Sequence, residues 1–188
     1  IGIQEVVKSS TSLVGLLNRV CEGNLDSIYT ELIALIKKSS PVPQLLASQL
    51  LSVACENHNI TMTLQGTFAA VACAMAVDTS PNSKYSLALL VELVTRIREL
   101  SLQPDSVRGV IVHVRFMGIL FLFGLIPFEV IESFVHFCLN ASVSTETKLE
   151  WILINFRFAG RVLKDKYKDR FVGLLREISD NLWKESSS

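Results

Sequence analysis

Apolar side chains recur along this chain at intervals of three and four residues, the spacing that places them on one face of an α-helix. The stripe appears first at Leu13, Leu16, Leu17 and Val20, and similar stripes follow through most of the sequence. Short breaks rich in glycine, proline, serine and asparagine separate them. The expected helices cover residues 13–20, 28–36, 40–57, 62–77, 84–102, 109–126, 127–140, 145–159 and 165–183.

Signals for β-strands are weak. Residues 110–114 are rich in β-branched side chains, but they lie inside a longer helical stretch, and no Asn-Gly or Asp-Gly hairpin turn is present. Helix pairs of about 35 to 45 residues with short connections predict an all-α fold, an α-solenoid of about five HEAT-type antiparallel helix pairs. A helical bundle is the alternative, although it would need fewer and longer helices.

Near the end of the chain, the stripe in residues 145–159 consists of Leu149, Ile152, Leu153 and Phe156. We expect these four side chains to face one way. The next stripe begins near residue 165, so a turn is predicted between the last two helices.

The most hydrophobic segment is RFMGILFLFGLIPFEVIESF, residues 115–134, which could lie in a membrane or in a core. Only 13 residues between Arg115 and Glu129 are free of charge, whereas a spanning helix needs about 20. The segment therefore predicts a buried core helix. The chain does not open with the charged and apolar regions of a secretory signal, so no membrane association is expected.

Composition is consistent with a globular protein. The 188 residues have a formal net charge of zero and are 49% hydrophobic, so bulk charge does not indicate nucleic-acid binding. We expect residues 1–188 to be a single domain and a fragment of a longer protein. The four cysteines have no C-x-x-C spacing and lie in helical patterns, which predicts buried free thiols in a reducing compartment: Cys21, Cys55, Cys73 and Cys138.

Candidate chemistry is sparse. The nine glycines are dispersed, so there is no phosphate-binding loop, and no metal-ligand spacing occurs among the histidines and cysteines. Cys55 lies three residues before His58, which could suggest a thiol nucleophile, but no third group is marked to orient the imidazole. Packing at a helix end is the simpler explanation. We expect no enzyme, no cofactor, no metal and no small-molecule substrate.

One segment has a distinctive local charge. The run RVLKDKYKDR, residues 161–170, holds five basic residues against two acidic ones. A solvated helix start is one interpretation. The functional alternative is a contact for an acidic partner or for RNA phosphates through Arg161, Lys168 and Arg170. Tyr167 is the only aromatic residue in the run, so base stacking has little support.

Three short motifs carry a family resemblance. The first helix contains GLLNRV at residues 15–20, the expected core helix contains RFMGILF at 115–121, and FAGRVLK follows at 158–164. Together they resemble the middle domain of eukaryotic translation initiation factor 4 gamma. The order and separation of the motifs span nearly the whole chain.

Two details refine the resemblance. Ile119 stands where the family usually has glutamate, so a contact made by that carboxylate would be missing here. The segment GLLNRVCEGNLDSI, residues 15–28, is most similar to the nucleolar branch of the family, whose members act in small-subunit ribosome assembly.

The resemblance implies a non-enzymatic scaffold that docks a DEAD-box RNA helicase of the initiation factor 4A type. By their location, Asn18 and Arg19 on the first repeat and Lys164, Asp165 and Lys166 near the last would suit two separated contacts with the helicase. For Asn18, capping or bridging of helices is an equal alternative. The implied location is the nucleolus or nucleus, with the cytoplasm as the alternative. Translation initiation, splicing, messenger RNA surveillance and direct RNA or peptide binding remain open.

Overall fold

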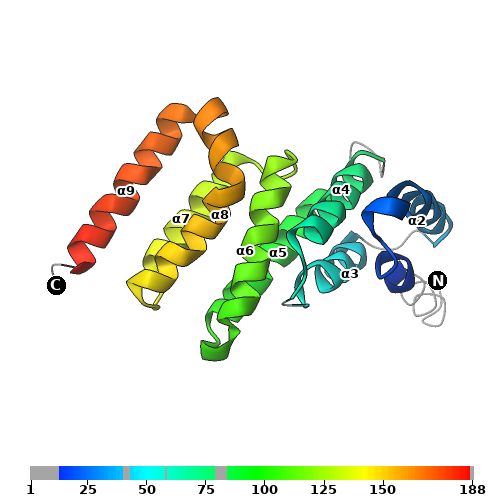
Figure 1. Ribbon diagram of the computed structural model, residues 1–188, viewed down its shortest axis with the longest axis horizontal. Coiled ribbons are helices and arrows are strands. Elements are labelled where there is room, and N and C mark those ends of the chain that lie inside the picture. Colours follow the sequence, from blue (N-terminus) through cyan, green and yellow to red (C-terminus); the bar gives the residue numbers. More distant parts are fainter. Residues whose placement is uncertain (1–12, 40–42, 58, 79–83, 187–188) are drawn as a thin grey trace. The chain divides into compact units, whose positions relative to one another are not determined.

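The computed structural model describes residues 13–39, 43–57, 59–78 and 84–186. Within these ranges the chain is helical and contains no strand, so the all-α prediction is confirmed (Figure 1). Residues 13–17 form the first helical segment. The later elements are η1 (Glu22–Asn24), α2 (Leu25–Ser39), α3 (Pro43–Cys55), α4 (Met62–Asp78), α5 (Tyr85–Ser101), η2 (Pro104–Ser106), α6 (Val107–Leu122), α7 (Phe128–Asn140), α8 (Thr145–Lys166) and α9 (Lys168–Ser186).

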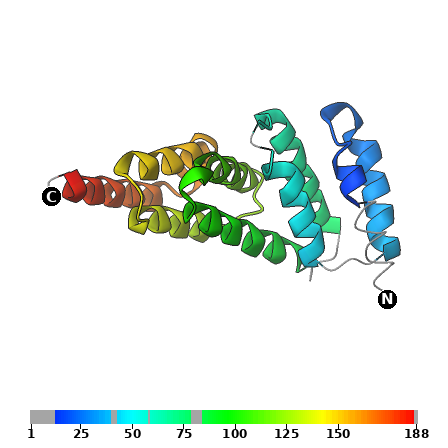
Figure 2. The same cartoon turned by 90° about the horizontal axis from the view of Figure 1, so that it is seen from below.

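The chain divides into two compact units, Ile1–Phe116 and Met117–Ser188, with the boundary inside α6. In the first unit α3 packs against α4 and α5, and α2 packs against α4. In the second unit α7, α8 and α9 pack against one another. Figures 1 and 2 show that α8 runs antiparallel to α7. The single-domain assignment stays a prediction.

Buried polar side chains join helices in the first unit. Gln65 on α4 is fully buried, and its amide nitrogen donates to the carbonyl oxygens of Ala54 at 2.8 Å and Val112 at 3.2 Å. Arg115 donates its Nε–H to the Gln65 amide oxygen and an Nη2–H to the Ile60 carbonyl at 2.8 Å. The network satisfies groups that burial would otherwise leave unpaired.

Most apolar side chains of the segment at 115–134 are buried, as predicted, although Leu122 and Phe123 at the end of α6 are 49% and 48% exposed. Phe116, Met117 and Leu120 on α6 are at most 1% exposed, and Phe128 and Ile131 on α7 are equally enclosed. No helix in the described part of the chain is long and apolar enough to reach across a bilayer.

The predicted end of the core helix was wrong by four residues, because α6 ends at Leu122 instead of Ile126. Gly124 adopts a left-handed backbone with φ +80°, and its N–H donates to the Phe121 carbonyl at 2.9 Å. The Leu125 N–H donates to the Leu120 carbonyl at 3.0 Å. This pair of hydrogen bonds is the Schellman motif, in which glycine provides the conformation that ends the helix.

The predicted turn between the last two helices was also misplaced. The helix α8 continues through Gly160 to Lys166, and Tyr167 alone separates it from α9. Gly160 does not stop the helix, because its backbone stays helical. Residues 161–166 therefore lie on a helix and not in a turn.

Burial corrects two further expectations. Leu153 is 62% exposed and does not face the core with Ile152, which is 2% exposed. Cys55 and Cys138 are buried free thiols as expected, but Cys21 is exposed and Cys73 is half-buried.

Candidate functional site

The first motif is helical only through Leu17, so the helix expected at 13–20 ends early, and residues 18–20 form a tight turn. The Asn18 N–H donates to the Val14 carbonyl at 2.9 Å, which closes the first helical segment. The Asn24 side chain then holds the turn, because its amide nitrogen donates to the Arg19 carbonyl at 2.7 Å and its oxygen accepts from the Cys21 N–H at 2.8 Å. Asn24, not Asn18, therefore performs the local bridging, and sequence reasoning missed it.

Asn18 and Arg19 are both exposed in this turn. The Arg19 guanidinium pairs with Glu31 on α2 at 3.1 Å, with the two side chains 59% and 50% exposed. Such an exposed pair contributes little to stability, so Arg19 can exchange this partner for another at small cost.

The second motif is structural. A β-carbon at Gly118 would lie 2.9 Å from the Asn155 carbonyl oxygen and 3.1 Å from the Phe158 β-carbon. Only glycine lets this part of α6 come so close to α8 without a shift. Ile119, where the resemblance expects glutamate, is 4% exposed and belongs to the core.

The third motif and the basic segment lie at the end of α8 and the start of α9. Arg161 is 92% exposed and forms an i, i+4 pair with Asp165 at 3.8 Å. Lys164, Lys166 and Lys168 are exposed as well. Residues 164 and 166 are about 200° apart around a helix, so the two lysines point to different sides.

Arg170 has a different environment from the other basic residues. Its guanidinium pairs with Glu129 at 2.8 Å and Glu132 at 3.0 Å, and its central carbon lies 4.0 Å from the centre of the Phe128 ring. The hydrogen bond from Arg170 lowers the pKa of Glu129. These contacts already engage Arg170, one of the three residues that the sequence analysis assigned to RNA, and they connect α9 to α7.

Tyr167 also belongs to the packing of this corner. Its ring centre lies 5.0 Å from that of Phe128 and 6.3 Å from that of Phe121. An aromatic ring held in this way is not presented to a nucleic-acid base.

No arrangement for catalysis is found among the described residues. Cys55 is fully buried, and desolvation raises the pKa of its thiol, which keeps it protonated and unreactive. His58, the proposed partner, lies outside the described residues. No group of three or more metal-ligating side chains occurs in the described ranges.

The predicted contact residues belong to separate units. Asn18 and Arg19 are in the first unit, and Lys164, Asp165 and Lys166 are in the second. No protein-family model and no curated protein matches this chain.

Proposed function

We propose that this chain is a non-enzymatic scaffold of the HEAT-type α-solenoid class that binds a DEAD-box RNA helicase of the initiation factor 4A type. The proposal rests on the three motifs at 15–20, 115–121 and 158–164. The observation that favours it most is that the candidate contact residues are exposed while their surroundings are fixed by packing and hydrogen bonds.

Both candidate contacts have this character. The Arg19 side chain projects from a turn that Asn24 holds with two hydrogen bonds. Lys164, Asp165 and Lys166 project from the last turn of α8, above the buried Leu163. Side chains on a fixed backbone lose little conformational freedom on binding, which favours docking to a folded partner.

Such a scaffold would act on its helicase through a population shift. It would accelerate ATP turnover only if it bound one arrangement of the two helicase lobes more tightly than the others. The similarity of residues 15–28 to the nucleolar branch favours small-subunit ribosome assembly as the setting. Translation initiation, splicing and messenger RNA decay are the alternatives.

The test is RNA-stimulated ATP hydrolysis by a panel of initiation-factor-4A-type helicases, with and without this chain. We expect stimulation of at least one member. Replacement of Arg19 by Glu, or of Lys164 and Lys166 by Glu, should weaken the stimulation by about tenfold through charge reversal. Lys37→Glu, an exposed change on α2, is the control that should leave it unaltered.

Two results would contradict this function. One is the absence of any effect on every helicase of the panel. The other is stimulation that the Arg19 variant and the Lys164 and Lys166 variant leave unchanged.

Direct RNA binding is the second candidate, favoured by the exposure of Arg161, Lys164 and Lys168. Phosphate contacts weaken steeply with salt, so retention on RNA should fall as salt rises. Binding that is absent, or that does not respond to salt, would count against it. Because Arg170 is engaged by Glu129 and Glu132, we expect Arg170→Ala to affect RNA retention less than Arg161→Ala.

A further inference from the structure

The helix α8 has two chemically distinct faces. One is buried within the second unit and includes Trp151, Ile152, Asn155, Ala159 and Leu163. The other points outward, and we call it the outward face of α8. Its members are Glu146, Leu149, Glu150, Leu153, Ile154, Arg157 and Arg161.

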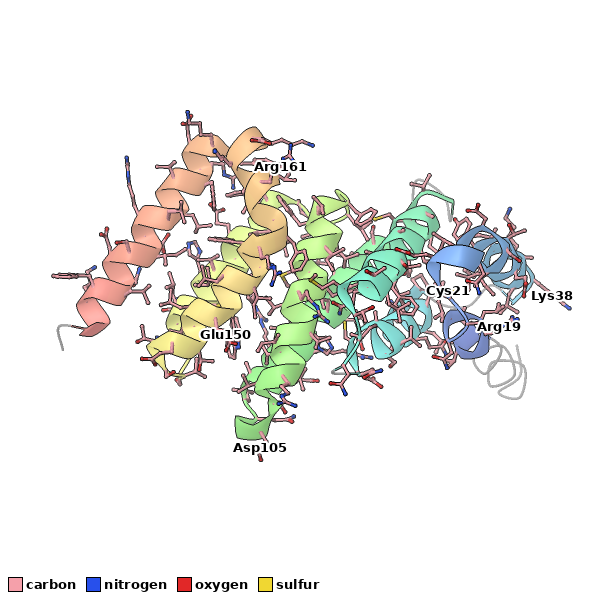
Figure 3. All side chains as sticks on the ribbon, in the orientation of Figure 1. Arg19, Cys21, Lys38, Asp105, Glu150 and Arg161 are labelled. Atoms are coloured by element: carbon pink, nitrogen blue, oxygen red, sulfur yellow. The ribbon has the colours of Figure 1, made fainter. Side chains whose placement is uncertain are left out.

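Charges on the outward face are separated along the helix. Glu146 and Glu150 occupy its first part, Leu153 and Ile154 its middle, and Arg157 and Arg161 its last part, where Arg161 also pairs with Asp165 at 3.8 Å. At about 100° per residue, most of these side chains fall within an arc of about 100°. Figure 3 labels Glu150 and Arg161 toward opposite ends of α8.

The apolar middle of this face is open to solvent. Leu153 is 62% exposed although it lies between two half-buried neighbours, Leu149 and Ile154. The face borders an open hollow of about 520 Å³. Its lining consists of α8 side chains: Glu146, Leu149, Glu150, Leu153, Ile154 and Arg157.

The charges on this face would match those of a second, antiparallel copy of the same face. Measured from the midpoint between Leu153 and Ile154, Glu150 and Arg157 each lie about 5 Å away along the axis, at a rise of 1.5 Å per residue. Glu146 and Arg161 each lie about 11 Å away on the same basis. A second α8 placed antiparallel therefore sets each glutamate opposite an arginine and Leu153 opposite Ile154.

We propose that the outward face of α8 is the interface of a homodimer, in which two copies of this chain pack α8 against α8 antiparallel about a twofold axis. Such an interface is isologous, so each glutamate–arginine pair forms twice. The exposed Leu153 of each copy packs into the hollow of the other. This inference does not depend on the helicase or RNA proposals.

Charge complementarity favours a second copy over other occupants. Nucleic acid would be attracted by Arg157 and Arg161 but repelled by Glu146 and Glu150 on the same face. A helix from another protein would have to supply the complementary order of acidic, apolar and basic residues independently. A second copy supplies that order by symmetry.

The dimer should be weak. Exposed ion pairs each contribute little, and a contact centred on one helix is small beside the roughly 800 Å² per partner of a standard interface. We expect a dissociation constant of about 10 to 100 µM, increasing with salt because the pairs are screened.

The experiment is sedimentation equilibrium of the full 188-residue chain at several concentrations and two salt levels, with circular dichroism to verify folding. An acid-reversed variant carries Glu146→Arg and Glu150→Arg, and a base-reversed variant carries Arg157→Glu and Arg161→Glu. Each alone should dimerise at least about tenfold more weakly, because pairs formed twice become repulsive. Lys38→Glu, an exposed change on α2, is the control that should dimerise like the wild type.

Recombining the charges gives the decisive comparison. An equimolar mixture of the two variants should form a heterodimer, and a chain carrying all four changes should again form a homodimer, each within about threefold of the wild-type constant. A wild-type chain that stays monomeric near 1 mM, a dimer indifferent to the reversals, or a mixture that does not recover association would overturn the proposal.

Discussion

Gly118 shows how one residue can fix the approach of two helices. Its missing side chain makes room for the Asn155 carbonyl and the Phe158 β-carbon, so α6 and α8 meet at backbone distance. The same glycine belongs to the motif at 115–121. Its presence there is explained by packing and needs no contact with a partner.

Replacing Gly118 by Ala should lower the free energy of unfolding by about 1–3 kcal/mol, because the added methyl group overpacks a rigid contact. Chemical denaturation would measure the change. Gly173→Ala on α9 is the matched control, because a β-carbon there meets nothing within 4 Å. That control should be neutral or stabilising by about 0.5–1 kcal/mol. Equal stability of the Gly118 variant and the wild type would contradict the packing argument.

Gln65 is the residue on which the buried network of the first unit depends. Gln65→Met keeps the volume but removes the partner of Arg115 and of two carbonyl groups. We expect the free energy of unfolding to fall by about 1–3 kcal/mol. Gln44→Met, an exposed change on α3, should stay within about 0.5 kcal/mol of the wild type.

A double substitution separates the network from simple packing. If Gln65 and Arg115 stabilise each other, the loss in the Gln65→Met/Arg115→Met variant should be smaller than the sum of the two single losses. Strict additivity would show that the two side chains act independently.

At the scale of elements, the start of α9 is held on α7 by Arg170. The guanidinium bridges Glu129 and Glu132 and covers the Phe128 ring. At the other end of α7, the buried Lys148 ammonium of α8 donates to the Leu139 carbonyl at 3.1 Å. A cation near the last carbonyls of a helix also interacts favourably with its dipole. Both ends of α7 are therefore fastened by basic residues from the following helices.

The Arg170 contacts predict a pH dependence. Glu129 has a lower pKa in the folded state than in the unfolded chain, mainly through its hydrogen bond from Arg170. The resulting stability is fully present above the unfolded value of about 4.3 and is lost as pH falls through the folded pKa. Thermal unfolding followed from pH 6 down to about pH 3 should show this loss.

Arg170→Met should lower the free energy of unfolding at neutral pH. It should also make the loss of stability in acid smaller than in the wild type. Arg161→Met, which removes only an exposed i, i+4 pair, is the matched control and should behave like the wild type. If the Arg170 variant lost stability in acid as steeply as the wild type, the contacts of Arg170 with Glu129 and Glu132 would not be the cause of the pH dependence.

Element boundaries show where sequence reasoning succeeds and where it stops. Apolar stripes, together with the breaks between them, located each described α-helix, because a stripe reflects a buried face and a break marks a turn. The short helices η1 and η2 were not predicted. They did not locate the end of α6, which depends on the left-handed backbone of Gly124, or the end of α8, where Gly160 remains helical. A glycine in a sequence does not reveal which backbone conformation it will adopt.

The candidate surfaces were predictable to a similar extent. Exposure of Lys164, Lys166 and Lys168 follows from their charge. The ion pairs of Arg170 could not be predicted, because Glu129 and Glu132 are distant from it in sequence. The outward face of α8 was missed because ending the helix at residue 159 separated Glu146 and Glu150 from Arg161. Leu153 was predicted to face the same way as Ile152, but it lies at the edge of the apolar stripe and is exposed.

At the scale of the whole molecule, a net charge of zero conceals local segregation. Acidic and basic residues lie at opposite ends of one exposed helix face. Total charge therefore says little about association by this chain, and salt should alter its dimerisation more than its formal neutrality suggests.

Chemical labelling of the two buried cysteines would detect local opening of each unit separately. Cys55 lies in the first unit and Cys138 in the second, both shielded from solvent, and burial raises the pKa of both thiols. An alkylating reagent can reach either sulfur only when the structure around it opens, so the labelling rate reports the open population. The exposed Cys21 should react first. Mass spectrometry of the labelled peptides should then show faster alkylation of Cys55 in the Gln65→Met variant and of Cys138 in the Gly118→Ala variant. The two alkylation rates would thus measure the opening of the two units independently.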